Sequence, residues 1–201
     1  MASSVDGRLA RGDITRSTVA RKSAEVATTH GLDSITIGSL ARATGLSKSG
    51  ILTVFGTREA IQVAAVAEAR KIYVETVITP VWDERPGGPR LRALLDSWVA
   101  YLRARVFPGG CFVAATSAEY GHRDGPVAEA VRDLKREWLD LLEAELIAAG
   151  STRPTDDAFR IDALLNAGNV RRELFGDDAE LERAHALALQ VLDQARTSER
   201  P

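Results

Sequence analysis

Two short segments with helical patterning, separated by a glycine, restrict the fold of this chain more than any other feature. The first segment can bury Leu40 and Ala41 against a neighbouring helix. The second can bury Ile51 and Phe55, which are four residues apart and therefore share one helix face. Between the segments, Gly45 can adopt the backbone angles that a tight turn requires. Two short helices joined by such a turn form a helix-turn-helix, which we expect here.

The remaining side chains of the second short helix are small, polar or basic. Ser47 can cap its N-terminus, and the residues after the cap that are not needed for packing point away from the core. The major groove of DNA admits a helix whose N-terminal residues reach base edges and phosphates. The segment therefore predicts a groove-facing set: Ser47, Lys48, Ser49, Gly50, Leu52, Thr53 and Val54. Two helices packed inside an ordinary α-helical bundle would show the same pattern, so this segment alone leaves both interpretations open.

The rest of the chain also has the period of α-helices. In 126–150, apolar residues recur three and four positions apart, Pro126 suits the first turn, and Gly150 suits the end. No segment alternates apolar and polar residues between hairpin turns, so we expect no sheet and an all-α fold of about nine helices. Apart from the two short ones, the expected helices cover residues 15–30 with Thr15 as N-cap, 57–80 with Thr57 as N-cap, 91–107, 111–120, 126–149, 155–176 and 177–196, and the first dozen residues are expected to fray.

Charge is distributed unevenly, although the net formal charge of the 201-residue chain is only −2. Residues 1–60 hold eight Lys and Arg against five Asp and Glu, and the remainder holds eighteen against twenty-three. A basic N-terminal part on an acidic body is typical of a chain that meets nucleic acid at one end. The sequence has no apolar run long enough to cross a bilayer and no apolar core of a signal peptide. We therefore predict a cytoplasmic protein with no membrane partner.

Catalytic and metal-binding patterns are missing from the sequence. His30, His122 and His185 stand apart, without the spacing of metal ligands. No glycine-rich phosphate loop follows a strand, since no strand is expected. Cys111 is the only cysteine, which excludes an internal disulfide and leaves open either a buried apolar role or a redox role. We therefore expect no enzyme, no catalytic residue, no metal and no cofactor.

The segment ITIGSLARATGLSKSGILTVFGTREAIQVA resembles the N-terminal DNA-binding domain of the TetR/AcrR family of transcriptional regulators. The resemblance covers residues 15–60 and the long helix that follows. It rests on Thr36, the Leu40-Ala41 core, the Gly45-Leu46-Ser47 turn, Phe55, and the Thr57-Arg58-Glu59 start of the next helix. A second stretch is similar to one C-terminal subgroup of that family: Pro108, Gly109, Gly110, Cys111 and Phe112, with Glu119 in the Ala-rich helix after them.

The resemblance implies a helix-turn-helix DNA-binding domain over residues 1–58 and a helical effector-binding and dimerisation domain over 59–201. It implies phosphate contacts for Thr36 and Arg58, on either side of the recognition helix, and a groove-facing role for Lys48, Ser49, Gly50 and Thr53. Leu52 and Val54 stand where many relatives have Tyr and His. Two polar contacts to the DNA backbone are therefore expected to be missing, and either residue can instead touch a thymine methyl group.

A small-molecule effector is the ligand that the resemblance implies for the second domain. Aromatic residues on its helices can line a cavity, and polar residues on otherwise apolar helices can orient a ligand, because a buried polar group needs a partner. Asn166 and Asn169 share one helix face, so they either bond across a dimer or meet a ligand. The predicted effector-binding residues are Trp98, Tyr101, Phe112, Thr116, Glu119, Trp138, Asn166 and Asn169. The aromatic members would also serve as ordinary core.

The last two predicted helices combine small residues, which permit close helix approach, with apolar area. Paired with their two-fold mates they would form a four-helix interface between two subunits, as the resemblance implies. The predicted interface residues are Ala163, Leu164, Ala167, Gly168, Leu174, Leu187 and Val191. An intramolecular core would fit the same periodicity.

These expectations combine into a homodimer whose partners are a double-stranded DNA operator and a small, largely apolar effector. Its recognition helices would lie about 34–36 Å apart on a palindrome. The effector would release the DNA by tilting the long helix 57–79. Repression is what the resemblance implies, and no residue decides between repression and activation. The alternative function is a helical dimeric protein-interaction module that has lost DNA binding.

Overall fold

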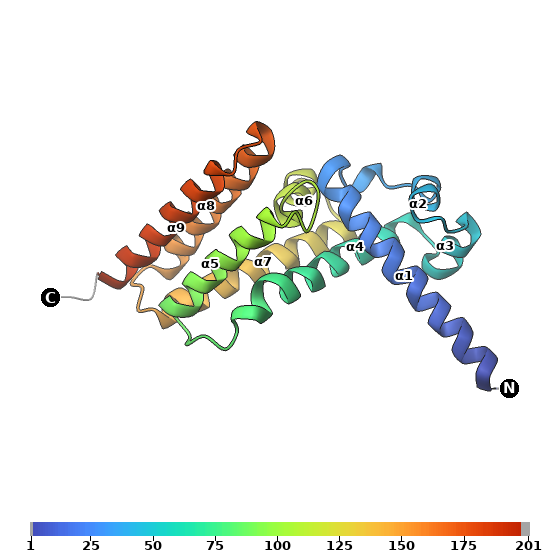
Figure 1. The fold of residues 1–201 in the computed structure, drawn as a ribbon, viewed down its shortest axis with the longest axis horizontal. Helices are drawn as coiled ribbons and strands as arrows, with labels where there is room; N and C mark the ends of the chain where they lie inside the picture. Colours follow the sequence, from blue (N-terminus) through green and yellow to red (C-terminus); the bar gives the residue numbers. More distant parts are fainter. Residues whose placement is uncertain (1, 198–201) are drawn as a thin grey trace. The chain divides into compact units, whose positions relative to one another are not determined.

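The computed structural model describes residues 2–197, which form nine α-helices and no strand (Figure 1). The all-α expectation is therefore confirmed. The helices are α1 (Ala2–His30), α2 (Ile37–Thr44), α3 (Lys48–Phe55), α4 (Arg58–Tyr73), α5 (Gly88–Arg103), α6 (Phe112–Tyr120), α7 (Pro126–Ala148), α8 (Pro154–Phe175) and α9 (Ala179–Thr197).

The chain divides into two compact units. The first unit consists of Met1–Lys71 and Phe107–Arg132, and the second of Ile72–Val106 and Asp133–Pro201. Helices α4 and α7 therefore each contribute residues to both units. Helix α6 lies in the predicted C-terminal domain, 59–201, but its contacts place it with the N-terminal helices. The functional boundary between residues 58 and 59 stays a prediction.

Helix α1 is longer than the sequence pattern indicates, because it begins at Ala2 and not at a cap on Thr15. Gly12 lies inside it. A glycine costs a helix about 1 kcal/mol but keeps its backbone N–H donor, unlike proline, so it does not end the helix. The predicted end is confirmed: Gly31 has a φ of +83°, and its N–H donates to the Ala27 carbonyl.

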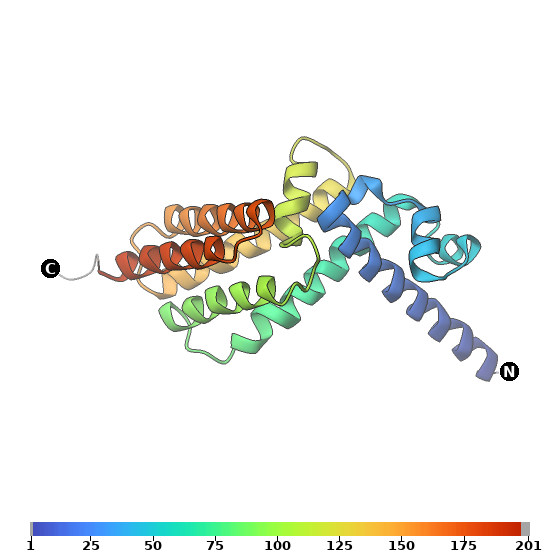
Figure 2. The ribbon, with the colours of Figure 1, turned by 45° about the horizontal axis from the view of Figure 1, so that its top comes forward.

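The first unit forms around the inner face of α1. This helix packs against α2, α3 and α6, and Figures 1 and 2 both show α2 and α3 side by side. Because the apolar residues of each short helix lie one turn apart, all of them reach one core. Its fully buried members include Val19, Ala24, Leu32, Ile35, Leu40, Ile51 and Ile61.

The second unit contains α5, α8, α9 and the larger part of α7. Helices α8 and α9 pack along each other (Figure 2), and α9 also packs against α5. The buried carboxylate of Glu145 in α7 accepts hydrogen bonds from the Gly87 N–H at 2.7 Å and from Arg90 at 3.1 Å. A buried carboxylate needs such partners, so these bonds fix the start of α5 against α7.

The long helix expected to run from Thr57 to about Pro80 is regular only to Tyr73. It continues as a π-helical turn, Val74–Ile78, and a 3₁₀ turn, Thr79–Val81. In residues 2–197, no single helix has both the length and the apolar composition of a membrane span. Helix α3 and the segment Arg58–Val81, which meet at a bend of 76°, together have the length and apolar composition of a membrane span.

Candidate nucleic-acid interface

The caps of α2 and α3 and the turn between these helices have the geometry that the sequence predicts. The Thr36 hydroxyl accepts a bond from the Ser39 N–H, and the Ser39 hydroxyl accepts one from the Thr36 N–H, so the pair forms a capping box. Gly45 follows α2 with a φ of +72°. The Gly50 N–H donates to the Ser47 hydroxyl at 3.0 Å, which confirms the predicted cap on α3.

Helix α3 is anchored through one face and exposed on the other. Ile51 and Phe55 are buried, and the Arg16 guanidinium from α1 lies over the Phe55 ring while donating to the Val54 carbonyl at 3.2 Å. Leu52 has 44% of its surface exposed, whereas Val54 is half-buried. The exposed face also carries Lys48, Ser49 and Thr53. The N-terminal end of α3 is therefore exposed to solvent.

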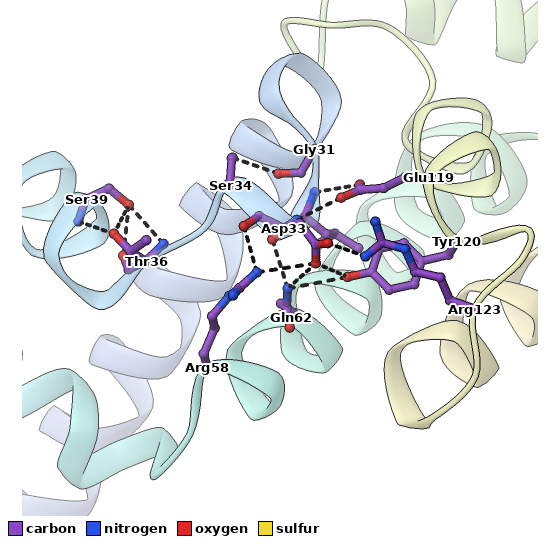
Figure 3. Close-up of polar contacts among 11 residues, drawn as sticks. Gly31, Asp33, Ser34, Thr36, Ser39, Arg58, Gln62, Glu119, Tyr120 and Arg123 are labelled. Atoms are coloured by element: carbon purple, nitrogen blue, oxygen red, sulfur yellow. Dashed lines mark hydrogen bonds and ion pairs between the residues drawn. The ribbon is translucent and has the colours of Figure 1, made fainter.

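Arg58 is the first residue of α4, directly after the cap that Thr57 provides through a bond from the Ala60 N–H. Its guanidinium donates to the backbone carbonyl of Asp33 at 2.6 Å and to the Asp33 carboxylate at 3.3 Å (Figure 3). Both side chains keep nearly half of their surface exposed. Thr36 follows the turn Leu32–Ser34 at the start of α2, and Arg58 reaches the same turn from the start of α4.

The Asp33 carboxylate is the centre of a polar cluster within the first unit (Figure 3). The Tyr120 hydroxyl donates to it at 2.9 Å, and Arg123 forms an ion pair with it. Gln62, which is buried, donates to the Leu32 carbonyl at 2.9 Å beside it. The bond from Arg123, which outweighs partial burial, and the bond from Tyr120 hold the pKa of Asp33 below its ordinary value of 3.8. Burial, followed by the bond to Asp33, raises the pKa of Tyr120 well above its ordinary value.

The Glu119 side chain of α6 binds backbone N–H groups of the same turn. Its two carboxylate oxygens accept bonds from the Leu32 N–H at 2.7 Å and the Asp33 N–H at 2.8 Å (Figure 3). A Cβ atom on Gly31 would lie 3.0 Å from a Glu119 oxygen, so this approach favours glycine at that position. Glu119 therefore holds α6 against the connection between α1 and α2.

Comparison with known proteins decides the family. A family model described as the tetracyclin repressor-like C-terminal domain matches residues 87–188, which is 102 of the 201 residues. The chain belongs to the TetR family. Members of this family are DNA-binding transcriptional regulators, and this TetR-family chain contains the helix-turn-helix described above.

Several solved structures share the fold of this chain. A TetR-family regulator from Streptomyces coelicolor, SCO4454, is 18% identical with a TM-score of 0.80, covering 90% of this chain and 96% of its own. A TetR regulator from Chloroflexus aurantiacus is 24% identical with a TM-score of 0.81, over 91% and 96% of the chains. A structure of AibR in complex with isovaleryl coenzyme A and operator DNA is 17% identical with a TM-score of 0.65, over 92% and 97%. No curated protein sequence matches the chain.

The predicted effector-binding residues of this TetR-family chain are divided between the two units. Phe112, Thr116 and Glu119 belong to the first unit, and the other five to the second. The buried Thr116 hydroxyl donates to the Phe112 carbonyl at 2.8 Å, so its polar group is paired within α6. The first-unit members thus make local structural contacts, and an effector role for them stays a prediction.

In the second unit, the predicted aromatic residues form part of a buried cluster. The Tyr73 ring meets those of Tyr101 and Trp138 edge-on, with centroids 5.6 and 5.7 Å apart, and Trp98 is also buried. Tyr73 lies at the end of α4, the long helix capped by Thr57, and no local spacing in the sequence links it to Tyr101 or Trp138.

The predicted polar members lie on α8. The Asn166 amide donates to Asp162 at 3.0 Å, and that carboxylate also accepts two bonds from Lys135 of α7. Asn169 is buried. Asn166 therefore has a partner within its own subunit.

The predicted dimer residues separate into exposed and buried sets. Leu174 is 71% exposed, Leu187 is also exposed, Ala163 and Ala167 are exposed, and Leu164 is half-buried. Gly168 and Val191 are buried within a single subunit. A Cβ atom on Gly168 would lie only 2.4 Å from the Ala184 Cβ of α9. Gly168 is therefore packed directly against α9 of its own subunit, which fits the intramolecular alternative, and its place in a dimer interface stays a prediction.

Several residues of the Asp33 cluster, and the Arg16 contact with α3, are not indicated by any sequence pattern. Asp33, Gln62 and Arg123 come together from positions up to 90 residues apart, and Arg16 reaches α3 from 38 residues away. No local spacing links such residues, so no pattern in the sequence indicates the cluster. Within the described part of the chain, no group of three His, Cys, Asp or Glu side chains is placed to hold a metal ion.

Proposed function

We propose that this TetR-family regulator is a cytoplasmic homodimeric repressor that binds a palindromic operator and leaves it when a small, largely apolar effector binds. The observation that carries the proposal is the exposed N-terminal end of α3, with Lys48, Ser49 and Thr53 on one surface and Arg58 at the start of α4. A capped helix with small, polar and basic groups at its N-terminus suits base edges and phosphates in the major groove.

Each residue of this surface has a proposed role. Thr36 and Arg58 contact phosphates on either side of the groove and set the position of the helix. Lys48, Ser49, Gly50 and Thr53 face the bases, with Ser47 at the cap. Leu52 is exposed enough to touch a thymine methyl group, while the half-buried Val54 contributes less to the contact surface.

The exposed apolar residues of α8 support a dimer. Phe159, Ala163, Ala167, Val170 and Leu174 recur every three or four residues, and all five are exposed, Phe159 by 72%. This is one stripe of the helix, and Leu187 of α9 lies beside it along a shallow groove of about 360 Å³. Two-fold pairing of α8 and α9 would cover this apolar surface, which is costly to leave in water. The TetR-family dimer proposed here thus uses the exposed members of the predicted set, together with Phe159 and Val170.

For the effector, the second unit offers an aromatic wall and a buried amide. Tyr101, Trp138 and Trp98 supply the wall, and Asn169 the polar group that orients a ligand. AibR was solved with both isovaleryl coenzyme A and operator DNA, so a chain of this fold can hold a small molecule and DNA. The effector can shift this protein only by its difference in affinity for the DNA-binding and released states. We propose that it acts by binding alone, without catalysis or a cofactor.

Binding to DNA that flanks the gene of this protein tests the proposal. Gel shifts at low salt, with an excess of mixed-sequence duplex as competitor, should show a discrete complex of one dimer on one site. The absence of a complex on every flanking fragment would favour the alternative function, a helical dimeric protein-interaction module that has lost DNA binding.

A further inference from the structure

Arg58 and Arg123 hold the same carboxylate from opposite directions. Asp33 lies in the turn Leu32–Ser34, Arg58 begins α4, and Arg123 follows α6 (Figure 3). Arg58 bonds to one carboxylate oxygen, which also accepts from Tyr120, while Arg123 pairs with the other oxygen. The negative charge of Asp33 is therefore shared between Arg58, which is proposed to contact DNA, and Arg123, which lies on the loop before α7.

The contact between Arg58 and Asp33 can exchange with a phosphate. Both side chains are nearly half exposed, and ion pairs at such positions contribute little net free energy because water screens them. A DNA phosphodiester offers the guanidinium two oxygen acceptors and one negative charge, as a carboxylate does. When Arg58 turns to a phosphate, its bonds to the Asp33 carbonyl oxygen, at 2.6 Å, and to the Asp33 carboxylate, at 3.3 Å, must lengthen or break, so Asp33 competes with DNA for this side chain.

Arg123 is placed to weaken that competition. It forms an ion pair with the oxygen of Asp33 opposite the one that Arg58 reaches, and its guanidinium lies over the Tyr120 ring at 4.8 Å. Its own backbone carbonyl accepts a bond from Arg132 of α7 at 2.9 Å, which fixes the loop. Because the charge of Arg123 offsets that of the carboxylate, and the Tyr120 hydroxyl occupies part of the oxygen that Arg58 reaches, the carboxylate attracts Arg58 less strongly.

We propose that Asp33 is a positioning residue whose carboxylate interacts both with Arg58 and with Tyr120 and Arg123 at the end of α6. The strength of its interaction with Tyr120 and Arg123 then sets how readily Arg58 reaches a DNA phosphate. A displacement of the loop between α6 and α7 that loosens Arg123 strengthens the hold on Arg58 and weakens DNA binding. Glu119 bonds the N–H groups of the same turn and keeps α6 in register with Asp33 during this exchange. The inference rests on the proposed phosphate contact of Arg58.

The test compares loss of Arg123 in the presence and absence of Arg58. The probe is a mixed-sequence duplex of about 40 base pairs, long enough for two half-sites, at low salt, since a phosphate contact does not depend on sequence. Arg123→Gln is measured against Arg136→Gln, which removes the same charge from an exposed residue paired with Asp133 one turn away. In the native background, Arg123→Gln should weaken binding about two- to fivefold more than its control, the range expected for one partly exposed ion pair.

In the Arg58→Ala background this extra loss should disappear, because no side chain is left for Asp33 to retain. An equal extra loss in both backgrounds, or no extra loss in either, overturns the inference and leaves the Arg58 contact standing. If Arg58→Ala itself changes neither the affinity nor its salt dependence, the phosphate contact of the proposed function is wrong and the inference fails with it.

Asp33→Asn should change the affinity for DNA in the opposite direction. It should raise affinity for the duplex and make Arg123→Gln indistinguishable from Arg136→Gln, whereas weaker binding by a folded Asp33→Asn protein would contradict the exchange. Should circular dichroism show that this variant is unfolded, Tyr120→Phe takes its place. That variant removes one donor from Asp33 and should weaken binding in the native background but not beside Arg58→Ala. Equal weakening in both backgrounds would overturn the proposal.

Discussion

At the scale of single residues, Arg58 is the side chain whose loss tests the DNA contact most directly. Arg58→Ala should lower affinity for all duplex sequences alike and reduce the slope of log affinity against log salt by about one unit, because one fewer counterion is released. Fluorescence anisotropy over a series of salt concentrations measures both quantities. Thr53→Ala, on the exposed face of α3, should instead change the preference among operators. A salt slope unchanged by Arg58→Ala would place the start of α4 away from the DNA backbone.

Asp33 makes the stability of the first unit depend on pH. Its pKa is lowered in the folded state, chiefly by the bond from Arg123, so its contribution to stability is fully present above its ordinary value of 3.8 and is lost as the pH falls through the lower folded value. The melting temperature of the native protein should therefore exceed that of Asp33→Asn at neutral pH, with the gap closing below pH 3.8. Because the side chain is nearly half exposed, the gap should be small. A gap that is constant from neutral to acid pH would show that the carboxylate charge contributes nothing.

At the scale of helices, the contact between α8 and α9 depends on one missing side chain. A methyl group at position 168 would lie 2.4 Å from the Ala184 Cβ and 3.2 Å from the Glu180 carbonyl oxygen. Gly168→Ala should therefore lower the free energy of unfolding by about 1–3 kcal/mol, the usual cost of overpacking. Urea denaturation measures this loss.

Ala184→Gly provides the matched test of that contact. Combined with Gly168→Ala it restores the space, so the double variant should be more stable than the sum of the two single changes predicts. Strict additivity would mean that the two helices can separate freely at this point. The same packing explains why Gly168 is conspicuous in the sequence as a small residue on an apolar helix, although its partner is intramolecular.

At the scale of the whole molecule, the exposed stripe of α8 predicts the oligomeric state. Phe159→Glu together with Leu174→Glu places two carboxylates where apolar surfaces of two subunits would meet, and charges buried without partners are strongly unfavourable. Sedimentation should report a monomer for this variant and a dimer for the native protein. Ile147→Glu is the control, because Ile147 is 60% exposed on α7, outside the stripe. If the double variant stays dimeric, the subunits meet through another surface.

The sequence by itself determined the features that depend on neighbours within one helical turn. The caps at Ser47 and Thr57 and the left-handed Gly45 follow from bonds and backbone angles of adjacent residues. The helices follow from apolar periodicity, since a sustained period near 3.6 permits no other regular structure. The tight spacing of the turn residues was specific enough to indicate the TetR family, which the match over residues 87–188 confirms.

Only the tertiary structure decided which helix face meets which. An apolar or charged face does not specify its partner, so the sequence allowed Gly168 to face another subunit and Glu119 to face an effector. Packing placed Gly168 against α9 and Glu119 against the turn before α2. The Asp33 cluster joins residues 25 and 90 positions apart, and such contacts exist only after the helices have closed around a common core.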